Sequence, residues 1–120
     1  RMVDPENTRH WQELVAMTVF ERLPDGWVRL RRAAAVNLTF RFARPKAHYR
    51  PNGDISARYL HVEHTKRPDI DKLSRTILDA LTTAGVWADD SQVYAMSARK
   101  TYAGPGDTPG VSILVTWGPQ

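Results

Sequence analysis

The sequence predicts a small mixed α/β domain in which helices pack on one face of a mainly antiparallel or mixed sheet. Two stretches carry apolar residues at helical spacing, and two others alternate apolar and polar residues, as half-buried strands do. The expected order is helix, strand, loop, helix, strand, strand, which suits one layer of helices on one sheet. At 120 residues the chain has the length of one domain, and we expect residues 1–120 to form a single one.

The first half of the chain is expected to contain one helix and one strand. Apolar residues recur at i, i+3 and i+4 over residues 5–22, which predicts a helix with Asn7 or Thr8 as its N-cap. A Pro-Asp-Gly turn follows at 24–26. Strict alternation of apolar and polar residues over 36–42 then predicts a half-buried strand.

A long basic loop is expected after this strand. Residues 43–58 contain two prolines and an Asn-Gly pair, which favour turns over regular structure, and 59–62 are expected to form a short strand. His61 and His64 have a spacing that suits metal binding on a helix but not on a strand. We therefore interpret this stretch as a solvated or DNA-facing edge.

The second half is predicted to be a helix followed by two strands. A residue before proline avoids the helical conformation, so Pro68 places the helix start near Asp69. The apolar stripe of this helix ends just before Gly85, where a left-handed C-cap is expected. Strands are then expected over 92–102 and 111–117, separated by a turn rich in glycine and proline.

Positive charge is concentrated in one part of the chain. The net charge is +4, from 17 Lys and Arg against 13 Asp and Glu, and residues 29–67 hold ten of the cations and only two acids. That balance favours a polyanionic partner. There is no cysteine, which excludes disulfides and thiolate metal sites and leads us to expect a reducing, cytoplasmic setting. No apolar run approaches the roughly 20 residues of a membrane helix, so we expect no membrane partner.

An acidic group flanks the second predicted helix. Asp69 is expected at its N-cap and Asp71 in its first turn, where the positive helix end stabilises carboxylates. Asp89 and Asp90 follow the short link after the helix. If the returning strand packs beside the helix start, three or four carboxylates gather in one place. Each acid alone has an ordinary structural explanation, and only their conjunction predicts a site.

Such a cluster suits a divalent cation, which removes the repulsion between the carboxylates. Hard oxygen ligands favour Mg²⁺, with Mn²⁺ as a substitute, and a metal held in this way can activate water and stabilise charge on a phosphodiester. Arg75, one helical turn after Asp71 on the same face, could neutralise a phosphate. Basic residues of the loop would contact a nucleic-acid backbone, and the candidates are Lys46, Arg50, Arg58, Lys66 and Arg67.

Three motifs at fixed spacing carry a resemblance to a known family. They are Arg-Pro-Asp-Ile-Asp-Lys-Leu at 67–73, Leu-Asp-Ala-Leu at 78–81 and Gly-Val-Trp-Ala-Asp-Asp-Ser-Gln-Val at 85–93. In this combination the chain resembles the RusA family of Holliday junction resolvases, the crossover junction endodeoxyribonucleases. The resemblance implies a RusA-like fold and a small homodimer that cuts four-way DNA junctions symmetrically with magnesium, in DNA recombination and repair.

The resemblance also implies the roles of the acidic residues. The catalytic carboxylates of the family fall on Asp69, Asp71 and Asp90, and Asp89 is the adjacent, supporting acid. A four-way junction has two equivalent strands to cut, and a two-fold dimer presents two identical sites to them.

Two matched positions depart from the family pattern. The catalytic lysine of the family falls on Arg75, which keeps the charge but is a poor proton donor at neutral pH. The usual asparagine after the second aspartate is Lys72, a candidate phosphate contact. A downstream basic residue of the family falls on Lys100, which we also expect to contact DNA. The opening strand of the family has no counterpart before the first helix, so we expect that an N-terminal strand is missing.

Two other functions stay open from the sequence. A basic dimer that grips branched DNA without cutting it is the runner-up, and the departures at Arg75 and Lys72 are its best support. A small phosphohydrolase acting on nucleotides is the third, although no base or ribose pocket is recognisable.

Overall fold

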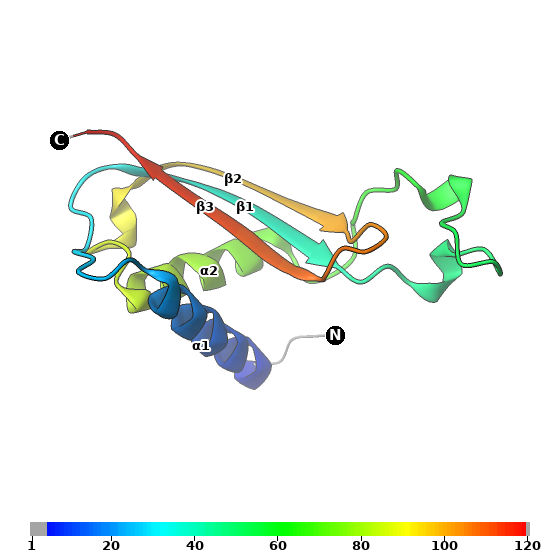
Figure 1. The fold of residues 1–120 in the computed structure, drawn as a ribbon, viewed down its shortest axis with the longest axis horizontal. Coiled ribbons are helices and arrows are strands. Elements are labelled where there is room, and N and C mark those ends of the chain that lie inside the picture. Colours follow the sequence, from blue (N-terminus) through cyan, green and yellow to red (C-terminus); the bar gives the residue numbers. More distant parts are fainter. Residues whose placement is uncertain (1–4, 120) are drawn as a thin grey trace.

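The computed structural model describes residues 5–119, with side chains from Thr8 onward, and confirms the predicted fold class. Both of its helices lie on one face of a three-stranded sheet (Figure 1). Residues 43–67 project beyond one end of that sheet, and we call this segment the basic arm. In chain order the elements are α1 (Pro5–Arg22), β1 (Ala34–Phe42), η1 (Lys46–His48), η2 (Ala57–Tyr59), α2 (Ile70–Ala84), η3 (Asp90–Gln92), β2 (Val93–Tyr102) and β3 (Gly110–Trp117).

The sheet is mixed, with β1 at its centre. β2 pairs with β1 in parallel and β3 pairs with it antiparallel, which gives the strand order β2-β1-β3. Two parallel strands need a crossover connection, and α2 provides it here. The carboxyl ends of β1 and β2 therefore lie at the same end of the sheet as the start of α2, next to the basic arm (Figure 1).

The core lies between β1 and the helices. Alternate residues of β1 from Val36 to Phe40 are buried, because they point to the same face of the sheet. α2 covers this face with Leu73, Ile77 and Leu81. Full burial of one such side chain contributes about 1.5–3 kcal/mol. This packing fixes the position of α2 on the sheet and so places the acidic residues at its two ends.

Both ends of α2 lie where the sequence places them. Asp69 is the N-cap residue, with an extended backbone at φ −72° and ψ 143°, directly after Pro68. Gly85 ends the helix with φ 86°, in the left-handed region that favours glycine.

α1 has the expected range but not the expected cap. It begins at Pro5, a residue that is favoured in the first helical turn, so Asn7 and Thr8 lie inside the helix. One side of α1 packs alongside α2, where Ala16 is buried. Within residues 5–119 neither helix is long and apolar enough to cross a membrane.

The basic arm differs from the expectation in one respect, since residues 59–62 do not form a strand. Residues 57–59 form the short η2 turn, and the chain continues through a further turn. The strand pairing found in the described arm is a single antiparallel bridge between Tyr49 and Ile55. Ring packing, described below, takes the place of a sheet in holding the arm.

Candidate active site

The start of α2 presents two carboxylates to solvent. Asp69 and Asp71 are both exposed, and the helix N-terminus favours their ionised forms. An N-cap aspartate usually accepts a hydrogen bond from the first helical turn, but the Asp69 side chain does not. Among residues 8–119, neither carboxylate has a hydrogen bond or an ion pair. Both oxygen pairs are therefore available to a ligand.

These carboxylates line a groove of about 1800 Å³ that runs between α1, α2 and the end of β1. Its apolar wall includes Trp11, Phe40 and Phe42. Its charged wall mixes both signs and consists of Arg41, Arg67, Asp69, Asp71, Lys72, Arg75 and Asp79. Small-ligand pockets enclose roughly 300–1,000 Å³. A larger groove whose wall carries charges of both signs suits a segment of a charged polymer better than a small molecule.

The second pair of acids lies beyond the other end of α2, at η3. Asp89 caps η3, and its Oδ2 accepts a hydrogen bond from the backbone N–H of Ser91 at 2.8 Å. That hydrogen bond lowers the pKa of the Asp89 carboxyl below its ordinary value. Asp89 thus has a structural partner, unlike the two acids at the start of α2.

Gln92 fastens this turn to the rest of the fold. Its Oε1 accepts hydrogen bonds from the N–H groups of Ala88 and Asp89 at 3.0 and 2.9 Å. Its Nε2 donates to the carbonyls of Leu30 and Arg32, both at 2.9 Å. Sequence reasoning gave Gln92 no role. Its position three residues after Asp89, as in a capping box, was the signal that could have identified it.

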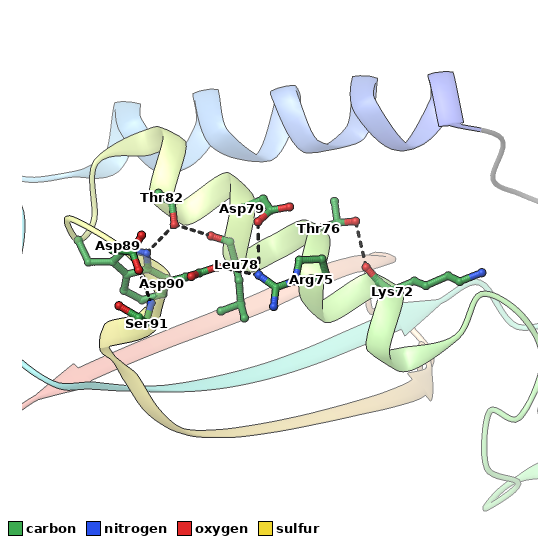
Figure 2. Close-up of polar contacts among 10 residues, drawn as sticks. Lys72, Arg75, Thr76, Leu78, Asp79, Thr82, Asp89, Asp90 and Ser91 are labelled. Carbon is green, nitrogen blue, oxygen red and sulfur yellow. Dashed lines mark hydrogen bonds and ion pairs between the residues drawn. The ribbon is translucent and has the colours of Figure 1, made fainter.

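Arg75 connects α2 to η3 (Figure 2). Its Nη1 lies 2.6 Å from Oδ2 of Asp90 and 3.6 Å from Oδ1 of Asp79. The hydrogen bond and charge of Asp90, followed by the charge of Asp79, raise the pKa of Arg75 above its ordinary value. Although Arg75 follows Asp71 by one helical turn, the side-chain ion pairs of Arg75 in residues 8–119 are with Asp79 and Asp90. Arg75 instead reaches toward the carboxyl end of its helix.

The four acids consequently do not form one cluster. Within the described side chains, no group of three or more His, Asp or Glu residues is placed to hold a metal ion. Asp69 and Asp71 line the groove, whereas Asp89 and Asp90 do not. The physical reason is that α2 lies between the two pairs in the chain and that Asp90 forms an ion pair with Arg75. Within one chain, the expected convergence of all four carboxylates is therefore not present.

Two lysines assigned to DNA contacts have different surroundings. Lys72 is exposed, and its side chain extends away from Arg75 and the η3 acids (Figure 2). Lys100 lies on β2 and is half-buried, with its Nζ donating hydrogen bonds to the backbone carbonyls of Lys66 and Pro68. Lys72 is therefore placed to meet a phosphate, while the Lys100 ammonium faces the protein backbone.

The remaining candidate contacts lie on the basic arm. They are exposed cations, and Arg67 also lines the groove beside Asp69. The set comprises Lys46, Arg50, Arg58, Lys66 and Arg67. Their positions extend the charged surface from the groove along the arm.

Two histidines of the arm are buried, which corrects the interpretation of His64 as part of a solvated or DNA-facing edge. The ring of His64 stacks on Phe42 at 4.2 Å, and the ring of His48 stacks on Tyr59 at 4.3 Å. Both histidine rings also contact Tyr102.

Burial lowers the pKa of both histidines. The positive charge of Arg44 adds to the effect at His48, and that of Lys100 adds to it at His64. In each ring, Nδ1 is buried without a hydrogen-bond partner in the described structure. The arm is thus held to the sheet by aromatic packing around neutral histidines.

A comparison with protein-family models now adds to this geometry. The model for endodeoxyribonuclease RusA matches residues 1–116. The chain belongs to the RusA family. The family implies a nuclease that acts on branched DNA and resolves Holliday junctions. No curated protein matches the sequence.

The family match spans the whole segment that joins the two acidic pairs. The RusA match covers both the groove acids, Asp69 and Asp71, and the η3 acids, Asp89 and Asp90. It also covers every cation assigned above to DNA contacts. The fold explains the spacing of this RusA motif, because one helix, α2, separates its two acidic pairs.

Proposed function

We propose that this RusA-family chain is a magnesium-dependent, structure-selective endonuclease that resolves four-way DNA junctions by paired, symmetric nicks. One observation carries the proposal. The carboxylates of Asp69 and Asp71 face a large groove rich in charge, and neither has a partner in the described part of the chain. Carboxylates left available beside cations that can hold phosphates suit a metal-assisted attack on a phosphodiester.

Asp69 and Asp71 fit Mg²⁺ by the chemistry of their oxygens. This ion is commonly held by one or two carboxylates and completes its shell with waters and substrate phosphate. When bound, it would supply an activated water and stabilise the charge that develops on the phosphate. Mn²⁺ also accepts oxygen ligands and would substitute for it.

The η3 acids would join this set only after a rearrangement. Asp90 is engaged by Arg75 at 2.6 Å, and Asp89 by the backbone of its own turn. The role of Asp90 as a family carboxylate therefore depends on release of its partner. We propose that Asp90 acts with Asp69 and Asp71 once Arg75 turns to a phosphate, and that Asp89 supports Asp90 by shaping the turn.

Arg75 would act on the DNA through its charge. A guanidinium stays protonated at any working pH, so it can stabilise a phosphate but cannot serve as a general acid. It can also form two parallel hydrogen bonds with phosphate oxygens. Lys72 and Arg67 line the same groove and would hold the neighbouring phosphates.

The basic arm would position the junction. Its exposed lysines and arginines offer contacts to the DNA backbone, and such contacts set register and orientation without reading bases. Recognition of a junction by shape needs contacts of this kind. We propose a homodimer as the active unit, because two-fold symmetry would offer one site to each of the two equivalent strands.

The first test uses a synthetic four-way junction incubated with the protein and Mg²⁺. We expect paired nicks at symmetric positions, which Asp71→Asn reduces at least about 100-fold while the affinity for the junction is retained. Asp25→Asn, in an exposed turn outside the groove, is the matched control and should cut normally. Cutting by Asp71→Asn at the normal rate would contradict the proposal.

The alternative is a basic dimer that binds branched DNA without cutting it. The ion pair of Arg75 with Asp90 favours this function, because it withholds one of the family carboxylates. Tight binding of the junction with no nicks in Mg²⁺, Mn²⁺ or any other divalent metal would select the alternative.

A further inference from the structure

Lys100, on β2, directs its ammonium group at two backbone carbonyls of the protein. In the register of the sheet it pairs with Phe40 of β1, so both residues point to the face covered by the helices. The lysine is half-buried there. Its Nζ lies 2.9 Å from the carbonyl oxygen of Pro68 and also donates to the carbonyl of Lys66.

The two acceptors bracket the part of the chain that forms the groove wall. The carbonyl of Pro68 belongs to the peptide group that leads into Asp69, and the carbonyls of Lys66 and Pro68 flank Arg67. Arg67 and Asp69 both line the groove. Orienting these two carbonyls therefore orients a cation and a carboxylate of the site.

Other ties on this segment are few. In the described chain, residues 63–68 form no backbone-to-backbone hydrogen bond. The next such bond along the chain is donated by the Leu73 N–H to the carbonyl of Asp69. The Asp69 side chain does not cap the helix. The ring of His64 stacks on Phe42 and so holds the segment at its start. Within residues 65–68 of the described chain, the hydrogen bonds are those from Lys100 to the carbonyls of Lys66 and Pro68.

The energetics agree with a structural use of this ammonium. A half-buried ammonium must replace the water contacts that it loses with other hydrogen-bond acceptors. Two carbonyls supply that replacement here. Burial lowers the pKa of the His64 ring, and the positive charge of Lys100 adds to this effect. An ammonium held in this way is not directed at a DNA backbone.

We propose that Lys100 is a positioning residue, which fixes the chain at the start of α2 and so sets Arg67, Asp69 and Asp71 on the groove. This inference rests on the proposed nuclease function for its consequence in catalysis. It replaces the expectation that Lys100 contacts DNA.

The experiment compares three variants with the wild-type chain. Lys100→Met keeps most of the stem and removes the ammonium, Lys100→Arg keeps a donor, and Lys46→Met removes an exposed charge from the basic arm. We expect Lys100→Met to lower kcat on the junction about 100-fold with KM unchanged, since small misplacements of reacting groups cost this much. Lys100→Arg should recover at least tenfold of that loss. Lys46→Met should raise KM and leave kcat unchanged.

A second readout does not depend on cutting. Hydrogen exchange of the Leu73 amide reports the first turn of α2, because this N–H donates to the carbonyl of Asp69. Lys100→Met should speed that exchange about tenfold relative to wild type, while Lys46→Met leaves it unchanged. Lys100→Gln, whose amide can donate to one carbonyl, should give an intermediate rate and serves if the methionine variant does not fold.

The outcomes separate this inference from the function on which it rests. An Lys100→Met variant with raised KM, normal kcat and unchanged exchange at Leu73 would identify a DNA contact and overturn the inference. A wild-type chain that cuts no junction would overturn the proposed function. Faster exchange at Leu73 in Lys100→Met would even then support Lys100 as the residue that holds the start of α2.

Discussion

The two ends of α2 use their acidic residues in opposite ways. At the start, Asp69 and Asp71 face the groove without partners in the described chain. After the end, Asp89 binds the backbone of its own turn and Asp90 binds Arg75. An acid that already has a partner helps to build the fold, and an acid without one is available to a ligand. The difference supports the proposal that a metal ion first binds at the start of α2, with Asp90 joining only after release from Arg75.

The backbones at the two ends are also held differently. The η3 turn is organised by its own residues, since Asp89 and Gln92 form a capping box within four positions. The start of α2 is held by Lys100, which lies 32 residues beyond Pro68 in the sequence. Local capping makes a turn robust by itself. A site held from a distant strand depends on the whole domain being folded.

The largest expected effect comes from removing Arg75, whose ion pair with Asp90 connects α2 to η3. Arg75→Ala should lower the nicking rate about 100-fold, because a phosphate in the groove loses its cation. The same change should raise the affinity for Mn²⁺ about tenfold, because Asp90 loses the partner that neutralises it. Nicking assays and calorimetric titration with Mn²⁺ measure the two effects separately.

Arg75→Lys and Asp79→Asn are informative controls for this prediction. The lysine variant keeps the charge and should retain more activity than the alanine variant. Asp79 lies 3.6 Å from Arg75, so its loss should leave the shorter contact with Asp90 in place. An unchanged Mn²⁺ affinity in Arg75→Ala would show that Asp90 does not belong to the metal site.

The next effect concerns stability at the η3 end. Gln92→Ala removes four hydrogen bonds to backbone groups and leaves the carbonyls of Leu30 and Arg32 without that partner. We expect the free energy of unfolding to fall by about 2–3 kcal/mol, measured by urea denaturation. Ser91→Ala is the control, since the hydrogen bond in this turn uses the Ser91 backbone N–H and not its hydroxyl.

The same variant tests the contrast between the two ends. Because Gln92 organises the turn and does not reach the groove, folded Gln92→Ala should bind a junction with unchanged affinity well below its melting temperature. A loss of junction binding with no loss of stability would mean that the η3 end contacts DNA.

Local rules were enough to locate α2 and its acids from the sequence. Pro68 and Gly85 mark the two ends of the helix by the backbone angles that they favour, and alternation of apolar residues identified β1. The parallel pairing of β1 with β2 follows less directly, because it depends on a crossover through the basic arm and α2. The fold class could be predicted because each element has a local signal.

Partners of charged and aromatic groups were harder to predict. The spacing places Arg75 on the same helix face as Asp71, but its shortest contact is with Asp90, 15 residues away in the sequence. Lys100 was assigned to DNA because it falls on a basic position of the family, and its hydrogen bonds to the carbonyls of Lys66 and Pro68 have no local signal in the sequence. His64 was placed at a solvated edge, because the ring of Phe42 that covers it comes from another element. Such contacts depend on tertiary structure and not on spacing.

The smallest expected effect is a pH dependence that also separates two regions, the basic arm and the η3 turn. Burial, with Arg44 near His48 and Lys100 near His64, lowers the pKa of both histidines from 6.5. Below pH 6.5 the unfolded chain therefore binds protons at these histidines more readily than the folded chain does. The contribution of the two neutral rings to the free energy of unfolding is complete above pH 6.5 and is lost as the pH falls below it. Asp89 behaves differently, because its pKa is lowered from 3.8 and its contribution persists until the pH falls below that value.

His64→Phe separates these contributions. A phenyl ring can stack on Phe42 and Tyr102 as the imidazole does, but it cannot take up a proton. Melting temperatures between pH 8 and pH 5 should therefore fall less steeply for His64→Phe than for the wild type, while His61→Phe, at an exposed position, should keep the wild-type slope. An equal slope in all three proteins would mean that protonation of His64 does not loosen the arm. Because the arm leads into Asp69, its loosening at pH 5–6 should reach the groove while the η3 turn is still intact.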